Sequence, residues 1–342
     1  MMNFSAISDK FGKNFDLRTF LKKHMMEIVL LALIVILAIV NDKFLTTANI
    51  FTMLRANAHF GVIAFGMTMV IITGEIDLSV GSTVALSGIL IARMSEWLYA
   101  VPDAAGKMVF PEHIPAFGAI LGILAICVFA ASVGSIIGFI RFKFGLPTFI
   151  ISLTFLYITY GLAFAVSGGM PVRGYPDWYR FLGTGTPLGI PMPVLILLVV
   201  FVIVFVIMSY TKFGRSVYAV GGNPEAARLS GVNVLKVRIS VHIIVQLLAA
   251  LAGILISAGI GSATHPLGKG WELNAISAVV LGGAAMTGGI GRVWGTCIGI
   301  IFLAVVVNGL TLLNVSDDAQ YVVKGMLILG AVLFNAIQSR KA

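Results

Sequence analysis

Two acidic residues lie in a glycine-bounded stretch between two apolar segments. The stretch reads TGEIDLSVGS at 73–82 and contains Glu75 and Asp77. Glycine-broken backbone at membrane depth is tolerated only where protein or a watery cavity covers it, and such breaks often line a transport site. We therefore interpret this stretch as a candidate pathway or hinge element. The alternative is a tight turn at the membrane surface, with Asp77 capping the next helix.

A second glycine-rich interruption has the same character. It reads LGGAAMTGGIG at 281–291 and also lies between apolar segments. The alternative of a plain surface turn applies here too. The candidate pathway or hinge residues in and near the two stretches are Glu75, Asp77, Ser79, Asn274, Gly282, Gly283 and Thr287.

The third chemically informative stretch is polar and helix-forming. It runs from 211 to 238 and reads TKFGRSVYAVGGNPEAARLSGVNVLKVR. Asn223 suits the N-cap of a helix and Pro224 suits its first position. Glu225 lies at the positive end of that helix, and Gly231 suits a left-handed C-terminal cap. We therefore predict a helix over 224–230. A helix of about two turns is marginal alone in water, which indicates a partner surface. Five basic residues outweigh one acid and place this loop on the cytoplasmic side: Lys212, Arg215, Arg228, Lys236 and Arg238.

The sequence offers no catalytic constellation. It contains no GxxxxGK[ST] phosphate loop, no HExxH motif and no Ser/His/Asp set at useful spacing, and its two cysteines, Cys127 and Cys297, are isolated. Ionisable residues inside the apolar segments are sparse, which argues against an ion-driven carrier. One of them, His242, has Gln246 one turn on and is expected to form interhelical hydrogen bonds. No catalytic residue, metal ligand or cofactor is predicted.

Composition defines the elements that position these residues. The chain has 342 residues, is 59% hydrophobic and 11% charged, and has a mean hydropathy of +1.03, values typical of a polytopic helical membrane protein. The net charge of +9 is spread in short clusters beside apolar segments, so nucleic-acid binding is excluded. We predict a single all-α domain over 1–342, with a cytoplasmic segment at 1–24 and a cytoplasmic loop at 211–238. Charge bias places both termini in the cytoplasm.

About ten membrane crossings fit this hydropathy and charge pattern. We predict them at Met25 to Val40, Ile50 to Thr73, Val80 to Ala100, Ala116 to Ile140, Pro147 to Ser167, Val194 to Tyr210, Ile239 to Ser262, Leu273 to Met286, Val293 to Leu313 and Tyr321 to Ala336. An outer segment at 168–193 contains Tyr175, Trp178 and Tyr179, for which we expect an interfacial aromatic belt, with docking of an external partner as the alternative. Repeated small residues, such as Gly134 and Gly138, predict close helix packing.

Four stretches carry a family resemblance: GMTMVIITGEIDLSVGS at 66–82, TKFGRSVYAVGGNPEAARLSGVNV at 211–234, WELNAISAVVLGGAAMTGGIGRVWGT at 271–296 and VKGMLILGAVLF at 323–334. With these, the chain resembles the membrane-spanning permease of ribose-type sugar ABC importers, whose relatives carry ribose, galactose, xylose, arabinose and autoinducer-2. The resemblance implies a plasma (inner) membrane permease that pairs with itself or a close relative. It also implies a cytoplasmic ATP-binding cassette subunit and an external binding protein, periplasmic or a lipoprotein, that delivers a sugar-like solute.

Within this resemblance the loop at 222–232 looks like the coupling helix that docks into the ATPase. The implied coupling residues are Gly222, Asn223, Pro224, Glu225, Ala226, Ala227, Arg228, Leu229, Ser230 and Gly231. Glu225 and Arg228 are the predicted polar contacts, with simple solvation as the alternative. A self-sufficient secondary carrier or channel is the rival function, and a membrane enzyme a third.

Two residues depart from the family pattern. Glu75 stands where the family usually has glycine, which indicates a different solute, a paired charge or a harmless surface position. Asn274 stands where aspartate is more common, so the outer end of the eighth predicted crossing loses a charge. A polar, neutral mouth there would suit a hydroxyl-rich solute.

Overall fold

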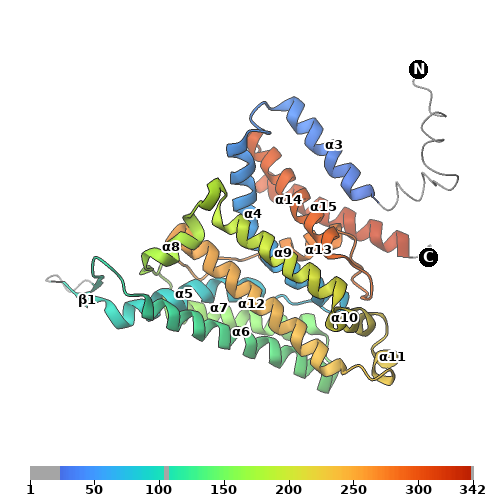
Figure 1. Cartoon of the computed structure of the whole chain (residues 1–342), viewed down its shortest axis with the longest axis horizontal. Coiled ribbons are helices and arrows are strands. Elements are labelled where there is room, and N and C mark those ends of the chain that lie inside the picture. Colours follow the sequence, from blue (N-terminus) through green and yellow to red (C-terminus); the bar gives the residue numbers. More distant parts are fainter. Residues whose placement is uncertain (1–23, 104–107, 340–342) are drawn as a thin grey trace.

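The computed structural model describes residues 24–103 and 108–339. Nearly all of the predicted cytoplasmic segment 1–24, and the basic tail at 340–342, lie outside the described residues. The described chain is helical apart from one small hairpin of β1 (Val101–Pro102) and β2 (Met108–Val109) (Figure 1). This confirms the predicted all-helical class.

Six of the described helices are long and apolar enough to cross a bilayer. They are α4 (Thr47–Ile72), α6 (Ala116–Phe144), α7 (Thr148–Ser167), α9 (Met192–Tyr210), α12 (Val234–Ile260) and α14 (Val293–Leu312). The remaining elements are α3 (Met25–Val40), α5 (Val80–Tyr99), α8 (Asp177–Thr184), η1 (Pro187–Gly189), α10 (Lys212–Gly222), α11 (Pro224–Leu229), α13 (Trp271–Leu281) and α15 (Asp317–Ser339). The chain is therefore a polytopic membrane protein.

The predicted eighth crossing at 273–286 is wrong as a continuous helix. The helix there, α13, has 11 residues, and at 1.5 Å per residue it covers roughly 16 Å of a hydrocarbon core about 30 Å thick. It ends at Gly282, and Gly283 follows with a φ of +87°, a conformation that glycine adopts without a Cβ penalty. Irregular backbone flanks α13 on both sides, as a broken membrane segment requires.

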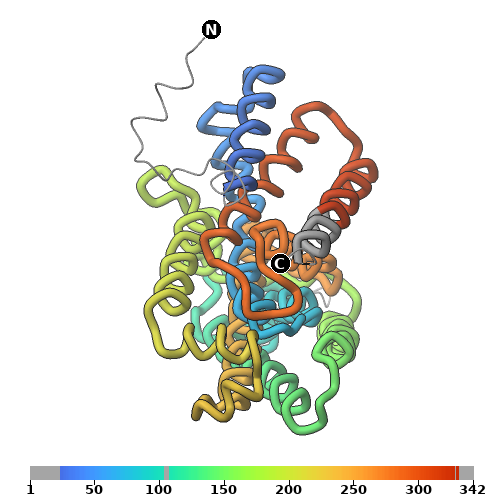
Figure 2. The backbone as a smooth tube through the Cα atoms, turned by 90° about the vertical axis from the view of Figure 1, so that its right-hand side faces the viewer, coloured from blue at the N-terminus to red at the C-terminus, as the bar shows by residue number. Residues whose placement is uncertain are grey.

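Helix α12 is the centre of the fold. It packs along α4, α5 and α6, and Figure 1 shows it running the length of the molecule. A Cβ on Gly138 of α6 would lie 2.7 Å from the Ile239 Cα, and Gly134 is equally close to the His242 backbone. These contacts confirm the close packing predicted from the small residues. The first described helix, α3, packs on α14 from the C-terminal part of the chain (Figure 1, Figure 2).

Two of the three aromatic residues predicted to form an interfacial belt in the 168–193 segment, Tyr175 and Tyr179, are buried inside the fold. The segment folds back as α8, where Tyr175 and Tyr179 are buried and their rings stack at 4.7 Å. The Tyr179 hydroxyl lies 2.6 Å from Ser257 Oγ on α12, and burial raises the pKa of Tyr179 well above its ordinary value. The belt prediction is therefore wrong for both tyrosines, whereas Trp178 is exposed.

Candidate functional site

The short helix α11 has the caps that its sequence predicts. Asn223 Oδ1 accepts hydrogen bonds from the backbone N–H groups of Glu225 and Ala226, both at 3.0 Å. Gly231 has a φ of +83°, and the N–H of Val232 donates to the Ala227 carbonyl at 3.0 Å. This pairing closes the helix in a Schellman-type end, so α11 stops at 229, one residue before the predicted end.

Helix α11 has little of its own chain to pack against. Of its six residues only Ala227 is buried, and Leu229 is 80% exposed. Arg228 Nη2 lies 2.6 Å from Glu225 Oε1, so the two predicted contact residues pair with each other on the exposed surface. A two-turn helix with an exposed leucine is unstable as an isolated segment. In this structure its caps and the flanking helices α10 and α12 hold it in place.

Helix α10 was not predicted, and it connects α11 to both glycine-rich stretches. Gly221 packs directly against the Ile72 carbonyl at the end of α4, with no space for a Cβ. The N–H of Gly289 donates to that same carbonyl at 2.8 Å. A Cβ on Gly288 would lie 2.7 Å from the Gly221 carbonyl oxygen and 2.9 Å from the Gly74 nitrogen. We call these five residues, Ile72, Gly74, Gly221, Gly288 and Gly289, the glycine joint.

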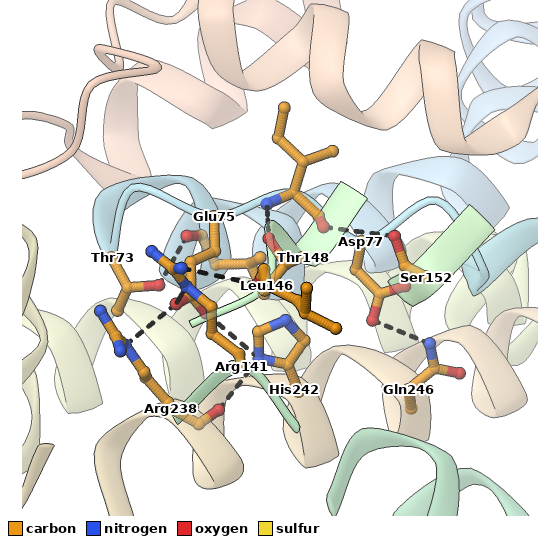
Figure 3. Close-up of polar contacts among 12 residues, drawn as sticks. Thr73, Glu75, Asp77, Arg141, Leu146, Thr148, Ser152, Arg238, His242 and Gln246 are labelled. Atoms are coloured by element: carbon orange, nitrogen blue, oxygen red, sulfur yellow. Dashed lines mark hydrogen bonds and ion pairs between the residues drawn. The ribbon is translucent and has the colours of Figure 1, made fainter. Parts of the chain in front are cut away.

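The acid of the first stretch is a paired charge. Figure 3 shows Glu75 surrounded by Arg141 of α6 and by Arg238 and His242 of α12. The Glu75 side chain is 1% exposed, and its Oε1 lies 3.2 Å from Arg141 Nε and 3.0 Å from Arg238 Nε. The Arg141 contact has hydrogen-bond geometry, whereas the Arg238 contact is an ion pair without it. His242 Nδ1 is 3.6 Å from Glu75 Oε2. These four residues form the Glu75 cluster.

Asp77 is held by a separate buried network. Its α12 member, Gln246, lies one turn after His242. The Asp77 Oδ1 accepts from the Ser79 N–H at 2.9 Å and the Ser79 hydroxyl at 2.6 Å. Gln246 Nε2 donates to Asp77 Oδ2 at 2.9 Å (Figure 3). Gln246 Oε1 accepts from the Thr83 hydroxyl at 2.6 Å. Gln246 thus makes the predicted hydrogen bonds between segments, whereas the His242 hydrogen bond is to the Arg238 carbonyl of its own helix at 3.0 Å, so the prediction is wrong for His242.

Helix α7 fastens the other side of the same stretch. Its Thr148 hydroxyl accepts from the Ile76 N–H at 3.1 Å (Figure 3). Its Ser152 hydroxyl accepts from the Leu78 N–H at 3.0 Å. Side chains therefore satisfy backbone groups that a non-helical segment leaves open. The 73–79 segment is thus pinned by contacts with three helices, α6, α7 and α12.

The predicted pathway residues do not form one site. Asp77 and Ser79 are fully buried, and the Thr287 carbonyl contacts Gly74 at the glycine joint. Gly282 and Gly283 form the bend that leads from α13 to that joint. Asn274 lies apart from them, in a pocket between α4, α13, α14 and α15.

Several residues of this arrangement escaped the sequence reasoning. In the sequence Arg238 indicates only the cytoplasmic side, and no role is predicted for Arg141, Thr148, Ser152 or Gly221. Glu75 itself could have indicated this cluster, because a carboxylate beside apolar helices needs a cation. Arg141 and Arg238 lie at helix ends on the predicted cytoplasmic side and could supply it. For Glu75, the paired-charge alternative holds and the surface alternative is wrong.

Apolar helices with a broken segment between them are the architecture of many membrane transport proteins. A family model described as branched-chain amino acid transport system / permease component matches residues 49–332, and the chain belongs to this family. It is a permease component, which confirms the predicted class, and it is not itself the ATP-hydrolysing subunit.

Curated relatives cover nearly the whole chain. The ribose import permease RbsC of Escherichia coli K12 is 38% identical over 326 residues, covering 94% of this chain and 96% of that protein. RbsC of Bacillus subtilis 168 is 40% identical over 312 residues, with 91% of each chain covered. The galactose/methyl galactoside import permease MglC of E. coli K12 is 33% identical over 327 residues, covering 94% and 96%. No solved structure matches the chain.

Proposed function

We propose that this chain is the permease subunit of an ATP-binding cassette importer for a sugar or a similar hydroxylated solute. It lies in the plasma (inner) membrane as one domain with about ten crossings and both termini in the cytoplasm. A cytoplasmic ATP-binding subunit, an external binding protein and a second permease copy or close relative complete the importer. The ribose and galactoside permeases to which it is similar over nine-tenths of its length support the solute class.

Helix α11 carries this proposal. It is exposed, capped at both ends and attached through α10 to the glycine joint, where the ends of α4 and of the 281–291 stretch meet. A displacement of α11 by a nucleotide-driven partner would therefore be transmitted through α10 to the end of α4, where the backbone of Gly221 contacts that of Ile72. No long side chain lies between these two backbones to absorb the displacement. This is the requirement for a coupling helix that switches a transporter between outward-open and inward-open states.

The test is co-purification from native membranes followed by sugar-stimulated ATP hydrolysis. We expect an ATP-binding subunit to accompany the wild-type chain, and both Gly231→Val and alanine replacement of 225–228 to uncouple hydrolysis from transport while the protein still inserts. Gly231→Val places a β-branched residue at a φ of +83° and distorts the end of α11. A matched control is Gly161→Val, which changes a glycine with open space around it in α7.

Two results would contradict the proposal. Normal sugar-stimulated hydrolysis in both α11 variants would remove the coupling role from this helix. A chain that purifies alone and carries solute down an ion gradient in vesicles would favour the secondary carrier instead. The family description names branched-chain amino acids, so leucine and isoleucine belong in the uptake panel, and their uptake in place of sugars would refute the solute class.

A further inference from the structure

A partly open pocket of about 230 Å³ lies between α4, α13, α14 and α15, and we call it the Asn274 pocket. Asn57, one of its lining residues, precedes Ile72 by 15 residues on α4, which is about 22 Å along an α-helix. The pocket is therefore far from the glycine joint. Asn57 is also ten residues after the start of α4, a depth of about 15 Å, so the pocket lies well inside the span of this helix.

Paired polar side chains join α4 to α14 on either side of this pocket. Asn49 and Asn308 exchange amide hydrogen bonds at 2.9 Å, and the hydroxyl oxygens of Thr68 and Thr296 lie 2.7 Å apart. Asn57 lies between Asn49 and Thr68 on α4. Within the described part of the chain, its side chain makes no hydrogen bond to α14. The polar residues of this helix contact thus satisfy one another except at the pocket.

Three polar side chains in the pocket keep hydrogen-bonding groups free. Asn57 Nδ2 donates to the Met53 carbonyl at 2.7 Å, which leaves its Oδ1 as an acceptor. The Ser277 hydroxyl donates to the Leu273 carbonyl, and its oxygen remains an acceptor. Asn274 is half-buried, and among residues 24–103 and 108–339 its side-chain amide has no hydrogen-bond partner. Polar groups at this depth need partners, which a hydroxylated solute or water supplies.

Trp271 gives the pocket a flat apolar wall. Its ring stacks on His59 of α4, with centroids 5.8 Å apart and planes within 5° of parallel. His59 is buried, and Phe60 beside it also lines the pocket, so the indole is held in a fixed orientation. Trp271 itself is half-buried and remains partly open. A sugar ring carries apolar C–H groups as well as hydroxyls, and an aromatic plane beside amides contacts both.

The charges near the pocket are balanced. Lys324 is the one basic residue among the described lining residues, and Asp317, two turns earlier on α15, interacts with it electrostatically. The Lys324 ammonium also lies over the Tyr321 ring, 5.4 Å from its centroid. Lys269 and Glu272 interact with each other in the same way, and neither lines the pocket. A solute without net charge therefore fits this environment, because a bare charge in a low-dielectric site needs an opposite charge.

We propose that the Asn274 pocket binds the transported solute and that this solute is an uncharged monosaccharide. Asn57, Asn274 and Ser277 bind its hydroxyls, and Trp271 packs against its ring. The volume of about 230 Å³ is below the roughly 300–1,000 Å³ of sites for drug-sized ligands, which suits one sugar ring and not two. This inference rests on the proposed import function and deepens it by naming the solute class and its site.

The test is saturation-transfer NMR on the purified full-length chain in lipid nanodiscs, a method that detects weak and rapidly exchanging ligands. The probes are ribose and galactose, the sugar acids ribonate and galacturonate, and the disaccharide lactose. We expect ribose or galactose to bind most tightly, with the C–H protons of the ring receiving the strongest saturation. The sugar acids and lactose should bind more weakly, because the pocket offers no unbalanced cation and no room for a second ring.

Four variants assign binding to the pocket. Asn57→Leu and Asn274→Leu each remove one amide and should weaken monosaccharide binding about threefold to tenfold. Trp271→Leu removes the aromatic wall and should cause a similar loss, which Trp271→Phe should largely restore.

A fifth variant and two controls test charge and specificity. Asp317→Asn leaves Lys324 without its acid and should raise the affinity for the sugar acids relative to the neutral sugars. Trp294→Leu changes a half-exposed tryptophan outside the lining, and Thr52→Val changes an exposed hydroxyl of α4, so neither should alter binding. Thermal unfolding and size-exclusion chromatography check the fold and the oligomeric state of each variant.

Four outcomes overturn the inference. Tighter binding of the sugar acids or of lactose to the unaltered chain removes the uncharged monosaccharide but leaves the import function standing. Monosaccharide binding that no pocket variant weakens removes the site. Dissociation of a dimer by Asn57→Leu and Asn274→Leu, with sugar binding unchanged, assigns the amides to contact with a second copy. Absence of any sugar binding also removes the site, while the import function is judged separately by the co-purification and hydrolysis experiment on α11.

Discussion

The Glu75 cluster predicts that one buried carboxylate holds three helices together. In the Glu75→Gln variant the side-chain volume remains, but the charge is lost and one of the two acceptor oxygens is replaced by an NH2 donor. Arg141, Arg238 and His242 then face one another without a counter-charge. We expect the chain to insert and fold, with a lower resistance to unfolding at the contact between α6, α12 and the 73–79 segment.

The magnitude follows from burial. Removing one partner of a buried ion pair costs about 3–5 kcal/mol. Arg141 is 27% exposed and Arg238 is 12% exposed, so water compensates part of the lost attraction. Allowing for this screening, we expect a loss of about 2–3 kcal/mol, well above the roughly 0–1 kcal/mol of an exposed pair.

The chain offers a matched control for this experiment. Glu225 pairs with Arg228, but their side chains are 65% and 64% exposed, so Glu225→Gln should change stability by less than about 1 kcal/mol. A double variant, Glu75→Gln with Arg238→Gln, should lose less than the sum of the two single variants, because the residues are in contact.

Thermal unfolding of the detergent-purified chain, followed by tryptophan fluorescence, provides the measurement. At about 2 °C per kcal/mol for a chain of this size, Glu75→Gln should lower the Tm by roughly 4–6 °C. A shift no larger than that of Glu225→Gln would show that the buried carboxylate contributes no more than a solvated one, and the reasoning from burial would be refuted.

Three further variants test the joint, the cap and the outer helix. Gly221→Ala forces a methyl group onto the Ile72 carbonyl and should abolish stimulated ATP hydrolysis in the assembled importer while assembly persists, whereas unchanged hydrolysis would exclude a tight joint. Asn223→Ala removes both cap bonds, costs α11 about 1 kcal/mol and should weaken capture of the ATP-binding subunit in the co-purification assay. Tyr179→Phe leaves the Ser257 hydroxyl without this partner and should cost about 1 kcal/mol in thermal unfolding, and an unshifted Tm would contradict the observed bond.

Local chemistry made α11 predictable from sequence. Asn223, Pro224 and Gly231 each act within four residues of their own position, so a cap or a left-handed turn can be recognised without knowing the fold. The same holds for the break after α13, where consecutive glycines end the helix. Hydropathy likewise predicted membrane helices, because each must satisfy its own backbone.

Long-range contacts were not predictable in this way. Arg141 and Glu75 are 66 residues apart in the sequence, and Gln246 and Asp77 are 169 residues apart. Local sequence spacing therefore does not predict that these residues pair. The prediction of an interfacial aromatic belt was wrong for Tyr179 because it also depended on long-range contacts. Tyr179 has the composition expected of an interfacial residue, but only the return of α8 onto α12 determines that its hydroxyl meets Ser257.

The use of glycine at the joint has a mechanical consequence. Long side chains between two backbones change rotamer and absorb a small displacement, whereas backbones in direct contact transmit it. The main chains of three segments are in direct contact at Gly74, Gly221 and Gly288. The pinned 73–79 segment links this joint to α7 through Thr148 and to α12 through Glu75. A shift of α11 would therefore reach the helices around the Asn274 pocket along α4, a single helix that contacts both regions.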